Sequence, residues 1–348
     1  MLDPNSYAVG WICAVGKELV AAQAFLDEKY DAPDDVPVND NNTYTLGRMG
    51  KHKVVIAAMP HRQQGLVSAA IVARDMVRSF PSIRLGLMVG VGGGAPSSKR
   101  DIRLGDVVVS SPGAGNGGVF QYDYGKTIQG QRFTVTGHLN QPPLFMLTAI
   151  AALQADYTIE GHTIQKRINS IIQEQPQLRE AYKRPSITTD RLYKSNFKHQ
   201  DGDEATCEMV CGNDESNLVP RIERTEDQDS PAIHYGLIAS ANQLMKNALV
   251  RDELSKEKGV LCFETAAAGL MNHFPCVVIR GICDYADTHN NSAWQGYSAM
   301  TAAAYAKDLL SKVAPNKVEA ERRLGEVLPE GYLVALFNDA VSSYMQKI

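Results

Sequence analysis

Residues 260–287 decide the fold, and they read VLCFETAAAGLMNHFPCVVIRGICDYAD. This stretch holds two apolar, strand-like runs, and an acidic residue ends each of them: Glu264 the first and Asp284 the second. Between them, the alanine-rich residues 265–273 are predicted to be helical. Ligands bind beyond the carboxyl ends of strands in open α/β sheets, so both carboxylates are expected at a functional edge. Glu18 follows the first strand-like run of the chain in the same way.

Strand-like and helical segments alternate along the chain. Buried strands are expected at 83–91 and 233–240, a hairpin at 43–59, and helices at 65–80 and 294–313. This alternation predicts an α/β fold with three layers, α/β/α, around a central, mixed and twisted sheet.

The expected division of the chain is one large domain and a short extension. Residues 1–315 are predicted to form the domain, with the polar stretch 156–230 as an insertion of helices and loops. Residues 316–348 are predicted to be a C-terminal helical appendage, because 333–345 carries apolar residues at helical spacing.

The composition is that of an ordinary globular protein, with 348 residues, 44% hydrophobic and 21% charged. A net charge of -4 supplies no basic field, so nucleic acid is not expected as a partner. No apolar run reaches the roughly 18 residues that cross a bilayer, and no membrane partner is expected. No signal peptide begins the sequence, which predicts a cytoplasmic, intracellular location.

Two local patterns could indicate a metal or a cofactor. The spacing Cys207-x-x-x-Cys211 could belong to a zinc site, but no second pair of good ligands stands nearby, so an ordinary loop is favoured. The run GVGGG at 90–94 approximates a dinucleotide fingerprint, but a polar loop follows it where that fingerprint needs a helix. We therefore expect no metal and no cofactor. The glycines would either let a ligand approach the backbone closely or form a tight turn alone.

Five segments, taken together and in this order, resemble the purine and uridine phosphorylase superfamily, which includes the methylthioadenosine/S-adenosylhomocysteine nucleosidases. They are AVGKE at 14–18, VGVGG at 89–93, GLIAS at 236–240, and the runs that end in Glu264 and Asp284. The resemblance covers roughly residues 7–313 and implies a nucleoside phosphorylase-like fold for a catalytic domain.

A sixth segment, GVFQYDYGK at 118–126, is similar to one found in fungal nucleoside phosphorylase-like domains. Those domains often precede nucleotide-binding and repeat domains in immune-receptor-like proteins.

The resemblance implies roles for three acids. Asp284 resembles the general acid that protonates the purine base as it leaves, which requires a partly desolvated site. Glu264 resembles the carboxylate that accepts hydrogen bonds from the ribose 2′- and 3′-hydroxyls. Glu18 resembles the nucleosidase residue that positions and deprotonates the attacking water. Three alternatives stay open: Asp287 as the acid, Asp284 as a turn residue, and Glu18 and Glu264 as charges that favour a helix N-terminus.

The same resemblance implies a substrate-binding wall. Phe263 would pack against the ribose or base, and Leu244 and Met245 fall where the family lines the base pocket. Leu244 replaces the usual aromatic residue there. Gly92 and Gly93 form the central glycine turn, and Val91 stands where a phosphorylase has a serine or threonine.

A missing phosphate site favours water over phosphate as the nucleophile. Met88 stands where hexameric phosphorylases carry an arginine, and residues 16–20 hold no arginine. A phosphate dianion without paired cations is poorly bound. Arg62 is the exception, because it could bind free phosphate or the 5′-phosphates of a nucleotide such as ATP.

The leading hypothesis is a purine nucleosidase, which hydrolyses the N-glycosidic bond of a purine ribonucleoside or ribonucleotide. A phosphate-dependent purine nucleoside phosphorylase is the first alternative. A catalytically silent, nucleoside-sensing module that oligomerises through 333–345 is the second. The resemblance also implies a homo-oligomer, a dimer or a trimer.

Overall fold

A long central strand, β5, ends in glycines and organises the sheet. The computed structural model describes residues 3–33, 35–199, 207–212, 214–225, 230–289 and 291–327. β5 (Leu85–Gly94) pairs in parallel with β1 (Val9–Cys13) on one side and with β12 (Cys276–Asp284) on the other. Parallel neighbours bury a strand on both faces, which is why its sequence is almost continuously apolar.

The sheet is mixed, as predicted. Its strands follow the order β11-β10-β6-β12-β5-β1-β4-β3-β2, and β7 pairs with β10. β11 also pairs with β5, so β5, β12, β6, β10 and β11 close on themselves. The expected hairpin is present as the antiparallel pair β3 and β4. The strands not yet bounded are β2 (Glu28–Tyr30), β3 (Tyr44–Met49), β4 (His52–Ala58), β6 (Val107–Ser110), β7 (Val119–Gln121), β8 (Gly125–Lys126), β9 (Thr134–Val135), β10 (Ile233–Ser240) and β11 (Val260–Glu264).

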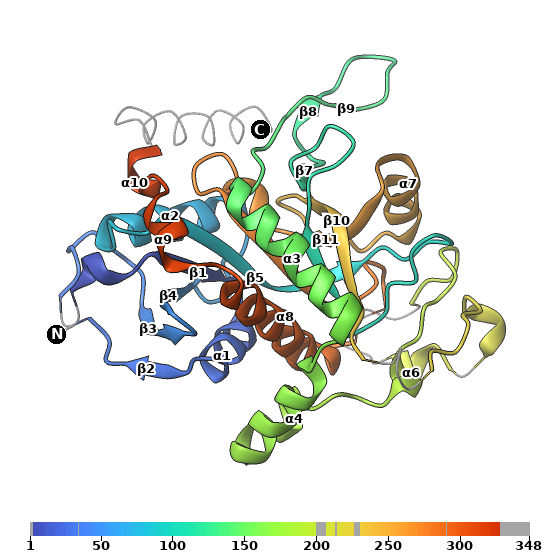
Figure 1. Ribbon diagram of the computed structural model, residues 1–348. Helices are drawn as coiled ribbons and strands as arrows, with labels where there is room; N and C mark the ends of the chain where they lie inside the picture. The colour runs from blue at the N-terminus through green and yellow to red at the C-terminus, as the bar shows by residue number, and fades with distance from the viewer. Residues whose placement is uncertain are drawn as a thin grey trace.

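Helices cover both faces of the sheet, which confirms the three-layer α/β/α architecture. Figure 1 shows α3 (Leu144–Glu160) and α8 (Trp294–Ser311) crossing the front of the sheet, with α2 (Leu66–Ser79) behind it. α8 lies so close to β12 that a Cβ on Gly281 would stand 1.8 Å from the carbonyl oxygen of Ser298. Small side chains on α8 permit this approach, which explains its alanine-rich sequence. The other helices are α1 (Gly16–Ala24), α4 (Ile164–Glu174), α5 (Arg179–Tyr182), α6 (Cys207–Val210), α7 (Ala248–Lys258), α9 (Pro315–Glu319) and α10 (Leu324–Val327).

The helix expected at 265–273 is wrong. That region holds one short 3₁₀ turn, Ala267–Gly269. A Cβ on Gly269 would lie 2.2 Å from the carbonyl oxygen of Leu66, so the segment is pressed against the start of α2. The Glu264 side chain accepts hydrogen bonds from the N–H groups of Ala266 and Ala267, the pattern of a side chain that caps a helix start, but only the short 3₁₀ turn follows it. Tertiary packing overrides the helical propensity of the alanines here.

The chain after α8 is helical in its described part. α9 and α10 follow one another, and the N–H of Leu324 donates to the carbonyl of Ile83, which fixes α10 near α2. The predicted helix at 333–345 lies outside the described residues. The division at residue 315 and the insertion 156–230 remain predictions. Among the described residues, no helix is long and apolar enough to cross a membrane.

Candidate active site

Three acids from distant parts of the chain gather along the glycine end of β5. Glu18 bonds the backbone of Val91, and Asp284 pairs in register with Gly93. The third acid, Glu264, reaches the same strand through Arg280, which pairs in register with Gly90. The sequence therefore predicted a set of acids that the fold brings to one strand segment of about four residues.

Glu18 is held by backbone donors from β5 and from the turn between β1 and α1. Its Oε2 accepts hydrogen bonds from the N–H groups of Ala14 and Val15, at 2.6 and 3.1 Å. Its Oε1 accepts one from the N–H of Val91, at 2.7 Å. The residue is only 4% exposed, so it is not a surface charge on α1. Burial raises the pKa of the Glu18 carboxyl, while the Arg280 charge and the three N–H donors oppose that rise.

The glycines of β5 make room for carboxylates. A Cβ on Gly90 would stand 2.2 Å from Oε1 of Glu18, and a Cβ on Gly93 would stand 2.6 Å from Oδ1 of Asp284. Neither position tolerates a side chain while the acid keeps its place. The tight turn expected at these glycines is absent, because they lie in the extended strand β5, which runs to Gly94. Their close contacts are with the protein's own acids, and close approach of a ligand stays a prediction.

Glu264 forms a buried ion pair with Arg280. The distance from Arg280 Nη2 to Glu264 Oε2 is 2.5 Å, and the two residues are 1% and 6% exposed. The same carboxylate also accepts hydrogen bonds from the N–H groups of Ala266 and Ala267. A carboxylate has about four acceptor sites, so most of its capacity serves the protein. Its role toward ribose stays a prediction.

Asp284 stands half-buried at the end of β12. Its Oδ1 accepts a hydrogen bond from the N–H of Ala286 at 2.8 Å, which orients the carboxyl group. Burial raises the pKa of Asp284, and the Ala286 N–H, the Cys283 thiol and the Lys246 charge oppose the rise. A carboxyl group of this kind keeps its proton at a higher pH than an exposed aspartate does.

The predicted binding wall is partly assembled. Phe263 and Met245 are buried in one small apolar cluster with Tyr122, whose ring meets that of Phe263 edge to face at 5.7 Å. Leu244 is 68% exposed, outside that cluster. Arg62 is also exposed, with a left-handed backbone φ of 61°.

Sequence reasoning missed Arg280 as a member of the site. It lies between Glu264, which it pairs with, and Glu18, whose carboxyl its charge influences. A signal was present, because an arginine inside the apolar run VVIRGI has to be paired when buried. Its position on β12 opposite Gly90 could not be read without the register.

Comparisons with known proteins agree with this architecture. No family model matches the chain. A nucleotide-binding leucine-rich repeat (NLR)-like protein of the fungus Hyaloscypha variabilis is 44% identical over 330 residues, which cover 95% of this chain and 32% of that protein. The chain thus spans about a third of the length of that relative.

Solved structures share the fold at low identity. A methylthioadenosine/S-adenosylhomocysteine nucleosidase from Neisseria meningitidis, in complex with methylthio-immucillin-A, superposes with a TM-score of 0.55 at 15% identity, over 88% of this chain and 99% of that one. Futalosine hydrolase of Helicobacter pylori gives a TM-score of 0.52 at 16% identity, with the same coverage of 88% and 99%. The fold is therefore that of the purine and uridine phosphorylase superfamily, as the sequence predicted.

Proposed function

We propose, from the nucleosidase-like fold of this chain, that it hydrolyses the N-glycosidic bond of a purine ribonucleoside or ribonucleotide. The observation that carries the proposal is the convergence of Glu18 and Asp284 on Gly90–Gly93 of β5. Two carboxyl groups with different surroundings can divide the work of an acid and a base. Two solved proteins that share this fold are a methylthioadenosine/S-adenosylhomocysteine nucleosidase and a futalosine hydrolase, which supports the proposal.

Asp284 is the proposed general acid. Cleavage of a purine glycosidic bond builds negative charge on the departing base, and a proton delivered to that base relieves it. The raised pKa of Asp284 favours this role, because a carboxyl group that keeps its proton to a higher pH is a better proton donor near neutral pH than an exposed aspartate is. Asp287 remains the alternative acid. It directly follows the turn in which the N–H of Ala286 donates to the Asp284 carboxylate.

Glu18 is the proposed base for water. Its three backbone bonds fix the carboxylate, and burial raises its pKa toward the working pH, which strengthens it as a base. A phosphate ion in the same place would meet this negative charge. It would also find the N–H of Val91 already donating to Glu18, and Met88 fully buried in the sheet. These contacts favour water over phosphate as the nucleophile.

The remaining predicted contacts complete the proposed site. Phe263 and Met245 would line the base and sugar pocket, with Leu244 at its rim and the backbone of Val91, Gly92 and Gly93 beneath the ribose. Arg62, whose backbone is in the left-handed conformation, would bind a 5′-phosphate if the substrate is a nucleotide such as ATP. Glu264 would hold the ribose hydroxyls with the acceptor capacity left by its ion pair. Assembly as a homodimer or homotrimer completes the proposal.

A chromatographic screen tests this function. Adenosine, inosine, guanosine, AMP and ATP are each incubated with the purified protein, and free base is measured over time. At least one of them is expected to release its base in phosphate-free buffer. Unchanged substrates together with measurable binding would point to the silent sensing module instead.

A further inference from the structure

Four metal-ligating side chains meet at a place that the proposed reaction does not use. His199, Cys207 and Cys211 come from one region of the chain, and His289 comes from the loop that follows β12. Their ligand atoms all lie within 4.8 Å of one another. The second pair of ligands that the sequence did not offer beside the two cysteines is thus supplied by two histidines. One precedes α6, and the other lies 78 residues after Cys211.

The distances among these atoms fit one tetrahedral ion. The Sγ atom of Cys207 lies 3.6 Å from Nδ1 of His199 and 3.6 Å from Nδ1 of His289. The Sγ atom of Cys211 lies 3.2 and 3.4 Å from the same two nitrogens. Zinc bonds of about 2.3 Å to sulfur and about 2.0–2.1 Å to nitrogen, at tetrahedral angles, require a sulfur-to-nitrogen edge of about 3.6 Å. All four edges are close to that length.

The surroundings of His289 orient it as a ligand. Its Nε2 lies 3.1 Å from the carbonyl oxygen of Phe197, so a proton on Nε2 leaves the Nδ1 lone pair facing the two thiols. The ring of Tyr193 stacks on the imidazole, with centroids 3.9 Å apart. A backbone carbonyl or carboxylate on the far nitrogen is the usual outer partner of a metal-bound histidine.

The chain around His199 is tied to the same loop. The N–H of His199 donates to Oγ1 of Thr288, and the N–H of His289 donates to Oδ1 of Asp287. The first bond ties the chain at His199 to the loop of His289 without the cysteines, and the second orders that loop. A preformed arrangement of ligands lowers the ordering cost of binding an ion.

We propose that His199, Cys207, Cys211 and His289 bind one Zn²⁺ ion in a structural Cys₂His₂ site. Nitrogen and sulfur ligands in this proportion are those of structural zinc, and four protein ligands fill the tetrahedron. No position is left for a substrate, so the ion holds the chain together and takes no part in bond cleavage.

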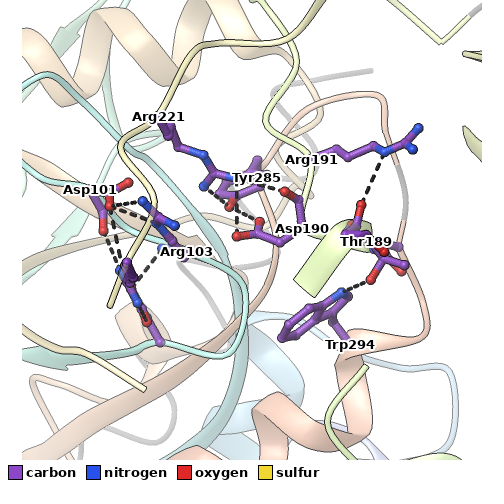
Figure 2. A network of polar contacts seen from close by, with 12 residues as sticks. Asp101, Arg103, Thr189, Asp190, Arg191, Arg221, Tyr285 and Trp294 are labelled. Atoms are coloured by element: carbon purple, nitrogen blue, oxygen red, sulfur yellow. Dashed lines mark hydrogen bonds and ion pairs between the residues drawn. The ribbon is translucent and has the colours of Figure 1, made fainter. Parts of the chain in front are cut away.

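The site would fasten the region around α6 to the loop that directly follows Asp284. A second connection joins the same two parts of the chain, and Figure 2 shows it. Tyr285, next to Asp284, donates to Asp190, and Arg221 binds both the Tyr285 hydroxyl, at 2.7 Å, and Asp190. The polar network and the zinc ion would hold residues 284–289 at both ends. Loss of the ion should therefore loosen this loop as well as α6.

The test is the metal content of the intact chain, purified without chelator and measured by elemental mass spectrometry. We expect about one zinc per chain in the wild type, and almost none in Cys207→Ser and in His289→Gln. The matched controls are Cys276→Ala, in the core of β12, and His138→Gln, at an exposed position. Both controls should keep about one zinc per chain.

Cobalt gives a second readout that does not depend on activity. Apoprotein reconstituted with Co²⁺ should show the intense visible bands of tetrahedral cobalt and sulfur-to-cobalt charge transfer, and Cys207→Ser should lose them. Wild-type protein with no zinc and no such bands would overturn the proposal. An intact mass lower by two hydrogen atoms, restored by reduction and mapped to a bond between Cys207 and Cys211, would overturn it in favour of a disulfide. Equal loss of zinc in the two control variants would also overturn the proposal, because the loss would not depend on the four ligands.

Discussion

The Glu18 carboxylate accepts a 2.7 Å hydrogen bond from the backbone N–H of Val91. This contact joins the start of α1 to the central strand and puts a negative charge beside the glycines at the end of β5. A free backbone N–H at this position could bind an anion such as phosphate. Here the donor serves an acid of the protein itself, which is the physical basis for preferring water as the nucleophile.

Replacement of Gly90 should disrupt that contact. In Gly90→Ala the new Cβ would lie 2.2 Å from Glu18 Oε1, so the carboxylate or the strand has to move. Overpacking of this kind costs about 1–3 kcal/mol, and we expect activity to fall with stability. The matched control is Gly16→Ala, because a Cβ at Gly16 has no neighbour within 4 Å. Chemical denaturation and base-release assays compare the two, and equal behaviour would contradict the assigned packing.

The buried ion pair should be far more important to stability than a surface pair. Glu264→Gln leaves the Arg280 charge buried without its partner, which typically costs about 3–5 kcal/mol of unfolding free energy. Glu28→Gln removes the exposed pair with Arg48 and should leave stability nearly unchanged. Urea denaturation measures both. If Glu264→Gln keeps wild-type stability but binds substrate poorly, the structural role of Glu264 is contradicted and a role in ribose binding is supported.

Loss of Asp284 should separate activity from stability. Asp284→Asn cannot protonate the leaving base, so we expect base release to fall by about 10²–10⁴-fold while ligand binding persists. The Asn Oδ1 can still accept the hydrogen bond from Ala286. Asp287→Asn is the comparison variant, and the opposite ranking of the two rates would assign the acid role to Asp287.

The stability difference between wild type and Asp284→Asn should depend on pH in a defined direction. Because burial raises the pKa of Asp284 above its unfolded value, the folded state binds the proton more tightly. Unfolding free energy then falls as pH rises through the interval from about 3.9, the unfolded value, to the folded pKa. Asparagine has no such penalty. Thermal melts should show Asp284→Asn more stable than wild type at neutral pH and close to wild type at about pH 3. A constant difference at both pH values would contradict the raised pKa.

The rate of base release should follow a bell-shaped pH profile. Activity rises as Glu18 loses its proton and falls as Asp284 loses its own. Burial raises the pKa of both carboxyl groups, so both limbs should lie above the ordinary carboxyl range of about 3.9–4.3. The two pKa values obtained from the pH profile of kcat/KM are macroscopic, so they belong to the pair of carboxyl groups and not to either residue alone. If the rate stays constant from about pH 4 to about pH 9, neither Glu18 nor Asp284 acts as an acid or a base in the reaction.

The sequence predicted the acids better than their surroundings. Apolar runs that end in Glu264 and Asp284 marked strand ends correctly, because period and burial are local signals. The 265–273 helix failed because the contact of Gly269 with Leu66 is tertiary. The meeting of Cys207 and Cys211 with His289 was out of reach for the same reason, since the ligands lie far apart in sequence and their spacing follows no zinc motif.

Product analysis with the best substrate of the nucleoside and nucleotide screen distinguishes water from phosphate as the nucleophile. Base, free sugar and sugar 1-phosphate are measured for wild type and Glu18→Gln, in phosphate-free buffer and in phosphate. The account predicts equal amounts of base and free sugar from the wild type in both buffers, and little of either from Glu18→Gln. Base release that requires phosphate and yields the 1-phosphate would contradict it.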